Sequence, residues 1–200
     1  MRLRSPPFPN DPDVPLSWVE PFTYGNGTLA GNGLWTLISG LGDIDVVSNR
    51  AVIEQTFQCG AENPCNGLPF DMSLPWSLEV VTNHSLSGGS TADVIVQFDA
   101  GGGNFVGVRW EATNSTADVE IFDASGTPNV LGNFSTAGNV TWRLIWDGSD
   151  LIVLRAGVEI GRTVGANITG ITPLCQIGGV VSDDLKPWRF DSLRVDHPPL

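Results

Sequence analysis

Two pairs of closely spaced carboxylates are the clearest candidates for acid–base chemistry in this sequence. Asp43 and Asp45 are separated by one residue, and Asp118 and Glu120 have the same spacing. Side chains alternate between the two faces of a β-strand, so both members of such a pair would point the same way. Glycoside cleavage needs two carboxylates about 5–9 Å apart. Gly42 indicates a turn beside the first pair. We interpret both pairs as solvated faces and predict no catalytic residue.

Nucleophilic catalysis has no better support. A Ser-His-Asp arrangement would need His84 or His197, the two histidines of the chain. His84 lies in a stretch rich in Asn, Ser and Gly that predicts a loop, and His197 begins a Pro-rich tail. The sequence has no Gly-x-Ser-x-Gly motif and no Gly-rich phosphate-binding loop. We therefore predict that the protein is not an enzyme.

Cysteine and aspartate side chains could bind metals. Cys59 and Cys65 enclose a short loop and could form a disulfide, which would leave Cys175 unpaired, but we favour three reduced thiols. A zinc site needs four closely spaced ligands, which these cysteines and the two histidines do not supply. Calcium prefers hard oxygen ligands. Predicted loops offer five of them: Asp99, Asp147, Asp150, Asp183 and Asp184. Since none has EF-hand spacing, we predict no cofactor and leave a structural calcium open.

The chain has seven tryptophans, and an exposed aromatic ring can form a platform for a ligand. Trp142 and Trp146 alternate with Leu144 on one face of a predicted strand, so we expect them in the core. A second strand has the same alternation at Val94, Val96 and Phe98. The residues near predicted strand ends are better candidates for a ligand-binding platform: Tyr24, Trp76 and Trp188.

The formal net charge of −12 restricts the partners. A strongly negative surface repels phosphate backbones and anionic lipids, so we predict neither nucleic acid nor a membrane as a partner. No apolar run approaches the ~20 residues needed to span a bilayer. The first residues include two arginines but no following apolar stretch, so we expect no signal peptide there.

Alternation of apolar and polar residues with period two recurs through most of the chain, with frequent turn signals. The predicted strands span residues 34–38, 43–47, 50–57, 76–82, 92–98, 105–111, 117–122, 140–146, 151–155, 156–161, 176–181 and 188–195. No segment has a convincing helical period. Many short strands without helices are typical of a β-sandwich or barrel, so we predict an all-β fold.

Prolines mark both ends of this strand-rich region. Residues 1–20 are Pro-rich and aperiodic, and proline cannot donate to a β-ladder, so we predict an extended arm. Residues 197–200 form a similar tail, which leaves one domain at residues 21–196. Phe8 and Trp18 are large apolar anchors in the arm. We expect both to dock in grooves as assembly contacts, with Phe8 on another subunit.

Residues 141–161 read TWRLIWDGSDLIVLRAGVEIG, in which two strands flank a DG turn and a second glycine turn follows. This segment of the C-terminal half resembles the central hairpins of concanavalin A-like and laminin-G-like jelly rolls. Residues 188–195 resemble the closing strand of that family, and residues 22–36 resemble its first strand. The resemblance spans about residues 21–196 and implies a two-sheet antiparallel β-sandwich of the jelly-roll kind.

The resemblance indicates fold more closely than function, because such modules occur in lectins, glycosidases, adhesion proteins and bacteriophage virion proteins. Glycosidases of this fold carry Glu-x-Asp-x-x-Glu on one strand, and we find no third acid beside either carboxylate pair. The opening residues most resemble modules of phage minor tail proteins. This implies a non-catalytic virion protein, of the minor tail or capsid-decoration kind, whose partners are other virion proteins, copies of itself and a host glycan. The alternative is an exported bacterial carbohydrate-binding or adhesion module, located outside the cell or at its surface.

Overall fold

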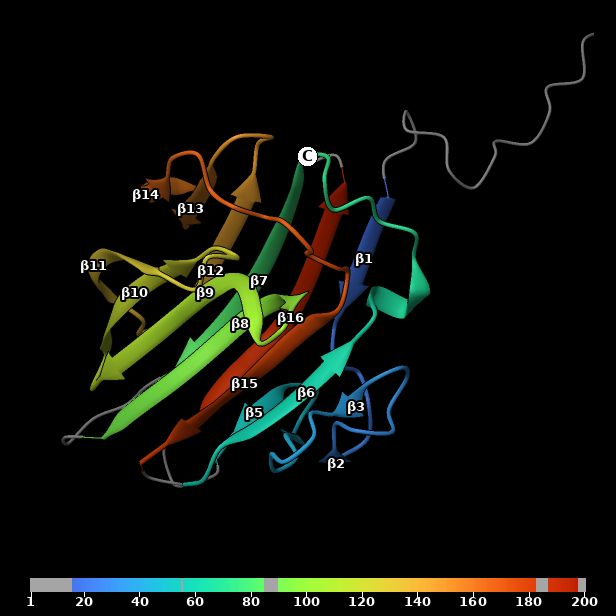
Figure 1. The fold of residues 1–200 in the computed structure, drawn as a ribbon. Helices are drawn as coiled ribbons and strands as arrows, with labels where there is room; N and C mark the ends of the chain where they lie inside the picture. Colours follow the sequence, from blue (N-terminus) through green and yellow to red (C-terminus); the bar gives the residue numbers. More distant parts are fainter. Residues whose placement is uncertain (1–15, 55, 85–89, 183–186, 198–200) are drawn as a thin grey trace, which may run out of the picture.

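The protein folds into two antiparallel β-sheets that pack face to face (Figure 1). The computed structural model describes residues 16–54, 56–84, 90–182 and 187–197. One sheet has nine strands in the order β14–β13–β12–β7–β16–β5–β4–β2, with β1 paired to β16. Its strands are β1 (Leu16–Glu20), β2 (Gly27–Thr28), β4 (Asp45–Val46), β5 (Ala51–Ile53), β7 (Trp76–His84), β12 (Gly138–Trp146), β13 (Leu151–Arg155), β14 (Val158–Thr163) and β16 (Trp188–His197).

The other sheet has seven strands in the order β11–β10–β9–β8–β15–β6–β3. Its strands are β3 (Thr36–Leu37), β6 (Cys59–Asn63), β8 (Thr91–Gly101), β9 (Asn104–Thr113), β10 (Thr116–Phe122), β11 (Pro128–Ser135) and β15 (Cys175–Val181). The only helical element in the described part of the chain is a short 3-10 turn, η1 (Cys65–Gly67), and no described helix is long and apolar enough to cross a membrane. The predicted all-β sandwich is confirmed.

A single core lies between the sheets, and the period-two patterns explain it. Trp142, Leu144 and Trp146 point inward from β12, and Trp142 and Trp146 are 1% and 6% exposed. The ring of Trp110, from β9 of the other sheet, meets Trp142 edge to face with 5.6 Å between centroids. The predicted inward row on β8 is also buried: Val94, Val96 and Phe98. The predicted core is confirmed, and the residues between these positions must point outward.

The domain begins earlier than predicted. Leu16–Glu20 form β1 and pair with residues 193–197 of β16. Trp18 is buried in the core of its own domain, 6.3 Å from the ring of Trp35. The predicted arm is therefore wrong for residues 16–20, because Pro15 is the last proline before them and their N–H groups are free to join a ladder. Phe8 and the rest of the arm lie outside the described residues.

Both histidines belong to strands, which corrects the predicted loop and tail. His84 ends β7, where it pairs with Gly138 and Trp188 in the two neighbouring strands. Its buried ring lies 4.3 Å from the ring of Trp188, and its Nδ1 is 2.7 Å from Thr136 Oγ1. Burial lowers the pKa of His84 to about 4. His197 ends β16 and is also buried, because β1 extends the ladder to this residue.

The three cysteines are buried free thiols. Cys59 begins β6 and Cys65 lies beyond the other end of that strand, so the bridge considered between them is not formed. The Cys59 thiol donates instead to the carbonyl oxygen of Gly179, 3.3 Å away in β15.

Candidate functional site

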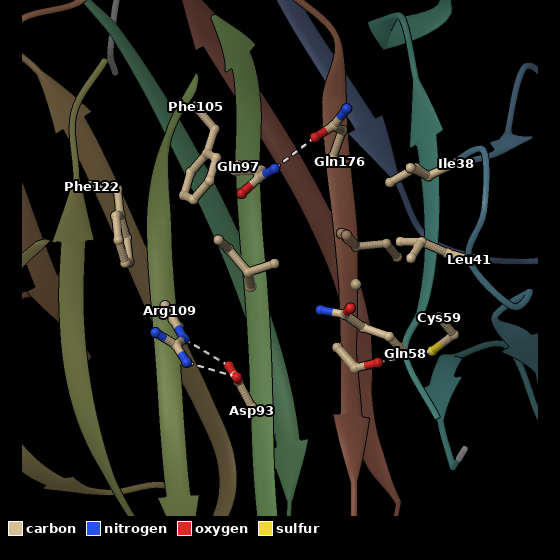
Figure 2. Close-up of a pocket in the computed structure, with 14 residues that line it drawn as sticks. Ile38, Leu41, Gln58, Cys59, Asp93, Gln97, Phe105, Arg109, Phe122 and Gln176 are labelled. Atoms are coloured by element: carbon tan, nitrogen blue, oxygen red, sulfur yellow. Dashed lines mark hydrogen bonds and ion pairs between the residues drawn. The ribbon is translucent and has the colours of Figure 1, made fainter. Parts of the chain in front are cut away.

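A hollow of about 370 Å³ opens on the outer face of the seven-stranded sheet (Figure 2). It crosses β6, β15, β8, β9 and β10, which are neighbours in this sheet. Its polar side chains include Asp93, Gln97, Arg109 and Gln176, which occupy the outward positions between buried residues of their strands. The alternation that builds the core thus also brings these four residues to one surface.

Glycines keep the floor of the hollow low. Gly178 of β15 pairs with Gly60 of β6 on one side, and Gly107 of β9 pairs with Gln97 of β8. A Cβ atom at Gly107 would lie 2.4 Å from the carbonyl oxygen of Val96, and one at Gly178 would lie 2.8 Å from that of Cys59. Any larger residue would push the neighbouring backbone and fill the hollow.

Apolar side chains form two opposite walls (Figure 2). Phe105 of β9 and Phe122 of β10 stand together on one side, with 5.1 Å between ring centroids. Ile38 and Leu41, from the segment between β3 and β4, form the other side. They pack over Gly60, where an added Cβ would lie 2.8 Å from Leu41 Cδ1. The hollow is therefore bounded by aromatic surface at one end and aliphatic surface at the other.

A chain of amides fixes the polar groups on the floor. Gln97 Nε2 donates to Gln176 Oε1 at 2.6 Å, and Gln176 Nε2 donates to Glu62 Oε2 at 3.0 Å. The three side chains sit opposite one another in the register of β8, β15 and β6. Each amide is thereby held in one orientation on the floor of the hollow. Gln97 Oε1 is buried and accepts no hydrogen bond from a described residue.

Arg109 forms a network with three carboxylates beside the amides. Its Nε and Nη2 donate to the two oxygens of Asp93 at 2.8 and 2.7 Å, a bidentate pair (Figure 2). Its Nη2 also lies 2.5 Å from Glu111, and its Nη1 lies 3.5 Å from Glu120. The hydrogen bond to Asp93 raises the pKa of Arg109 above its ordinary value. Burial raises the pKa of Glu120, although the positive charge of Arg109 opposes this.

A second hollow of about 520 Å³ adjoins the first on the same face and shares Asp93 with it. Its lining combines hydroxyl groups, at Thr91, Thr113 and Ser182, with the carboxylates of Glu111 and Asp118. The outer face thus changes from apolar walls and amides at one end to hydroxyls and acids at the other.

The aromatic platform predicted from the sequence is not there. Trp76 and Trp188 are both fully buried, although each begins its strand as predicted. Both side chains point into the core, where the ring of Trp76 lies 5.2 Å from that of Phe98 and the ring of Trp188 lies 5.8 Å from that of Trp110. Tyr24 is half-buried, and its hydroxyl donates to the buried carboxylate of Glu20 at 2.7 Å. None of the three lines either hollow. Ligand binding by Tyr24 stays a prediction.

The two carboxylate pairs have different positions. Asp43 accepts from the backbone N–H groups of Ala30 and Ile44 and so fixes a turn. Asp118 and Glu120 lie on the outward face of β10, beside the Arg109 network, as the alternation predicted.

Asp118 and Glu120 do have a third acid nearby, contrary to the interpretation of the sequence. Asp123 follows at the required spacing and gives Asp-x-Glu-x-x-Asp, with the two acid types exchanged relative to the glycosidase pattern. Asp123 lies just past the end of β10. There its carboxylate accepts from Ser125 and from the N–H of Asn167, which fixes a turn.

The described residues contain no group of three or more His, Cys, Asp or Glu side chains that could hold a metal ion. Asp147 and Asp150, considered for calcium, accept hydrogen bonds from backbone N–H groups of nearby turns. Asp183 and Asp184 lie outside the described part of the chain. A structural calcium therefore stays open, without a ligand set among the described residues.

Sequence reasoning missed the residues that line the hollow. Gln97, Gln176 and Arg109 lie on strands that were predicted, at positions expected to point outward. The alternation predicts that these side chains point outward, but it does not predict that the outer face of one sheet is hollowed. Gln97 and Gln176 are 79 residues apart, and only the pairing of β8 with β15 brings them together.

Comparisons with known proteins identify the fold. No family model matches the sequence, and no curated protein matches it. The metal-free carbohydrate recognition domain of Emp46p superposes with a TM-score of 0.62 at 11% identity, over 92% of this chain and 100% of that one. SCLam, a non-specific endo-β-1,3(4)-glucanase of family GH16, has a TM-score of 0.64 at 11% identity, over 92% of both chains. The Bacillus licheniformis β-glucanase has a TM-score of 0.60 at 9% identity, over 90% of this chain and 97% of that one.

These identities are low enough that the similarity concerns the fold alone. A potassium-bound form of the Emp46p domain is also similar, with a TM-score of 0.58 at 11% identity, over 92% of this chain and 99% of that one. The comparisons support the jelly-roll part of the resemblance and give no support to its phage part. The chain has the concanavalin A-like jelly-roll fold that these carbohydrate-recognition and glucanase domains share.

Proposed function

We propose that this domain binds a glycan chain in the hollow on the outer face of the seven-stranded sheet and does not cleave it. The observation that carries the proposal is the combination of two apolar walls with a floor of oriented amides in one hollow of about 370 Å³. Small-molecule sites are mostly apolar with a few fixed polar groups. A sugar ring matches this pattern, because it presents C–H surface to the walls and hydroxyl groups to the amides.

The similar structures support the same proposal. They are a carbohydrate recognition domain and two glucanases, and they share this fold over nearly the whole chain. A glycan partner also fits the location outside the cell or at its surface that was the alternative prediction from the sequence.

The test is a binding assay with a panel of neutral hexasaccharides: β-1,3-glucan, β-1,4-glucan and mannan. At least one should bind, and Phe105→Ala and Gln176→Ala should each weaken that binding by about tenfold, which corresponds to about 1.4 kcal/mol. Val158→Ala is the matched control, because Val158 is exposed on β14 of the other sheet. Melting temperatures must show that each variant is folded. The proposal is wrong if no neutral glycan binds, or if Val158→Ala weakens binding as much as the other two.

Glycoside hydrolysis is a second candidate, favoured by one observation. Glu120 has a raised pKa, as a general acid requires, and lies in the Asp-x-Glu-x-x-Asp pattern with Asp118 and Asp123. Two contacts speak against it: Asp123 is held in a turn, and Asp93, the carboxylate facing the hollow, is paired with Arg109. Release of reducing ends from the same hexasaccharides, abolished by Glu120→Gln, would favour hydrolysis over binding alone.

The virion role predicted from the sequence depends on the N-terminal arm. Residues 1–15 of that arm, including Phe8, lie outside the described residues. Trp18 contributes to the core of its own domain and so is not free to anchor the arm elsewhere. Deleting residues 2–14 tests the prediction: the melting temperature should stay, while incorporation into a particle should fall.

A further inference from the structure

The seven-stranded sheet is almost devoid of positive charge. Its strands all lie within the described part of the chain, and Arg109 is the only basic residue in them. They contain six acidic residues: Glu62, Asp93, Asp99, Glu111, Asp118 and Glu120. Five of them occupy outward positions between buried residues of their strands, and Asp99 continues the outward row of β8 near its end. The face that carries the hollow therefore has a strongly negative electrostatic potential.

Arg109, the single cation in the strands of this sheet, is already engaged. Arg109 contacts Asp93 through Nε and Nη2, Glu111 through Nη2 and Glu120 through Nη1. Its one positive charge thus serves three carboxylates. A carboxylate or sulfate group of a ligand would have to displace one of these partners to pair with Arg109. No other described Lys or Arg lies on this sheet to take its place.

The groups that remain for recognition among the described residues lining the two hollows are neutral or negative. The amides of Gln97 and Gln176 line the hollow, and carboxylate oxygens border it. Carboxylates accept hydrogen bonds and so suit the hydroxyl donors of a neutral sugar, while they repel another anion.

Building on the proposed glycan binding, we infer that the hollow selects uncharged glycan chains and excludes chains that carry carboxylate or sulfate groups. The network around Arg109 orients acceptors toward ligand hydroxyls and does not anchor an anion. Selection by repulsion of this kind excludes the wrong ligand without adding a contact to the right one.

The test compares each neutral hexasaccharide of the panel with the same chain after its C6 hydroxymethyl groups have been oxidised to carboxylates. At low salt the neutral form should bind at least about tenfold more tightly. Raising sodium chloride to about 1 M shortens the Debye length to about 3 Å, so the difference should shrink by about threefold or more. A difference that does not respond to salt would indicate a steric cause and overturn the inference.

A charge-removing variant gives a second, independent readout. Glu111→Gln combined with Asp118→Asn removes two negative charges from the hollowed face, and the ratio of neutral to anionic binding constants should fall by about threefold or more. Glu79→Gln combined with Glu159→Gln removes the same charge from strands of the other sheet and should leave the ratio unchanged.

Two failures are distinguishable. If carboxylated and neutral chains bind equally well, or if the two double variants change the ratio equally, the charge inference is wrong while glycan binding stands. If no member of either set binds, both the inference and the proposed function are overturned.

Discussion

The two sheets share one core but have different outer faces. The strands of the nine-stranded sheet contain five arginines, Arg143, Arg155, Arg162, Arg189 and Arg194, and six acidic residues, Glu20, Asp45, Glu79, Glu159, Asp191 and Asp196. Several of these form ion pairs, such as Arg194 with Asp196 at 2.9 Å. The seven-stranded sheet has the same number of acidic residues and the single Arg109. Charge is therefore nearly balanced on one sheet and strongly negative on the other.

This difference shows where the fold leaves room for function. Inward residues of both sheets must fill the space between them, so most of them are apolar on either side. Outward residues have no such constraint, and here they differ in charge, in glycine content and in shape. Gly60, Gly107 and Gly178 all belong to the seven-stranded sheet, which carries the hollow. An asymmetry between two faces that stand on the same core indicates a functional surface, because packing alone does not require it.

The largest loss of stability should come from a substitution in the core that the two sheets share. Trp142→Ala should lower the free energy of unfolding by about 3–5 kcal/mol, because it leaves a cavity between the sheets. Trp142 contacts Trp110 across the core, and its Nε1 donates to Thr82 Oγ1 at 3.0 Å, so that hydroxyl also loses a partner. Urea unfolding followed by tryptophan fluorescence measures the loss. A variant as stable as the wild type would mean that the two sheets do not depend on one core.

The pH dependence of stability gives a smaller effect, and it has opposite signs for a buried histidine of the interior and for a carboxylate of the acidic face. His84 is buried, with its pKa lowered to about 4, whereas an unfolded histidine titrates near 6.5. Between these values the unfolded state binds more protons, so stability falls as pH falls from 7 to 5, by about 2 kcal/mol. Glu120 has the opposite effect on stability. Because its pKa is raised in the folded state, the folded state binds a proton more readily than the unfolded state, and this favours folding as the pH falls.

Urea unfolding at pH 7, 6 and 5 should therefore show decreasing stability, and His84→Gln should remove most of that slope. Stability that rises on acidification over this range would mean that repulsion on the acidic face outweighs the buried histidine.

The sequence predicted the strands that have a clear alternation of buried and exposed residues, and it missed strands that lack one. Strands β7, β8, β9 and β12 were found because each buries one face, which gives a clear alternation. The short loop predicted between Cys59 and Cys65 contains β6, in which Gly60 resembles a turn residue, as does Pro64 just beyond the strand. Gly60 belongs in a strand here because Leu41 and Ile38 occupy the space where its side chain would be. β11 was missed because it contains no fully buried residue to reveal its period.

The candidate site was less predictable than the fold. Alternation places Gln97, Arg109 and Gln176 on an outward face, but the hollow depends on which strands are neighbours. β15 pairs with both β8 and β6, although these strands lie far apart in the sequence. The predicted tryptophan platform failed for a related reason: Trp76 and Trp188 begin their strands as predicted, but residues of the other sheet pack against these strand ends and bury both rings.

The smallest predicted effect compares one arginine from each sheet. Arg109→Gln should lower the free energy of unfolding by about 1 kcal/mol, because three carboxylates lose their shared partner and repel one another. Arg162 of β14 contacts Asp150 and Glu159, and it has other arginines on its sheet. Arg162→Gln is the matched control and should lower the free energy of unfolding less than Arg109→Gln does.

Salt sharpens the comparison between the two arginine variants. Repulsion among the carboxylates left on the hollowed face is screened at high ionic strength, so sodium chloride should restore more stability to Arg109→Gln than to Arg162→Gln. Thermal unfolding of both variants between about 0.05 and 1 M salt measures this difference. Equal losses and equal responses to salt would show that the six acids on the seven-stranded sheet are too well solvated to repel one another. The asymmetry in charge between the two faces would then have no energetic consequence, and selection against anionic glycans would lose its physical basis.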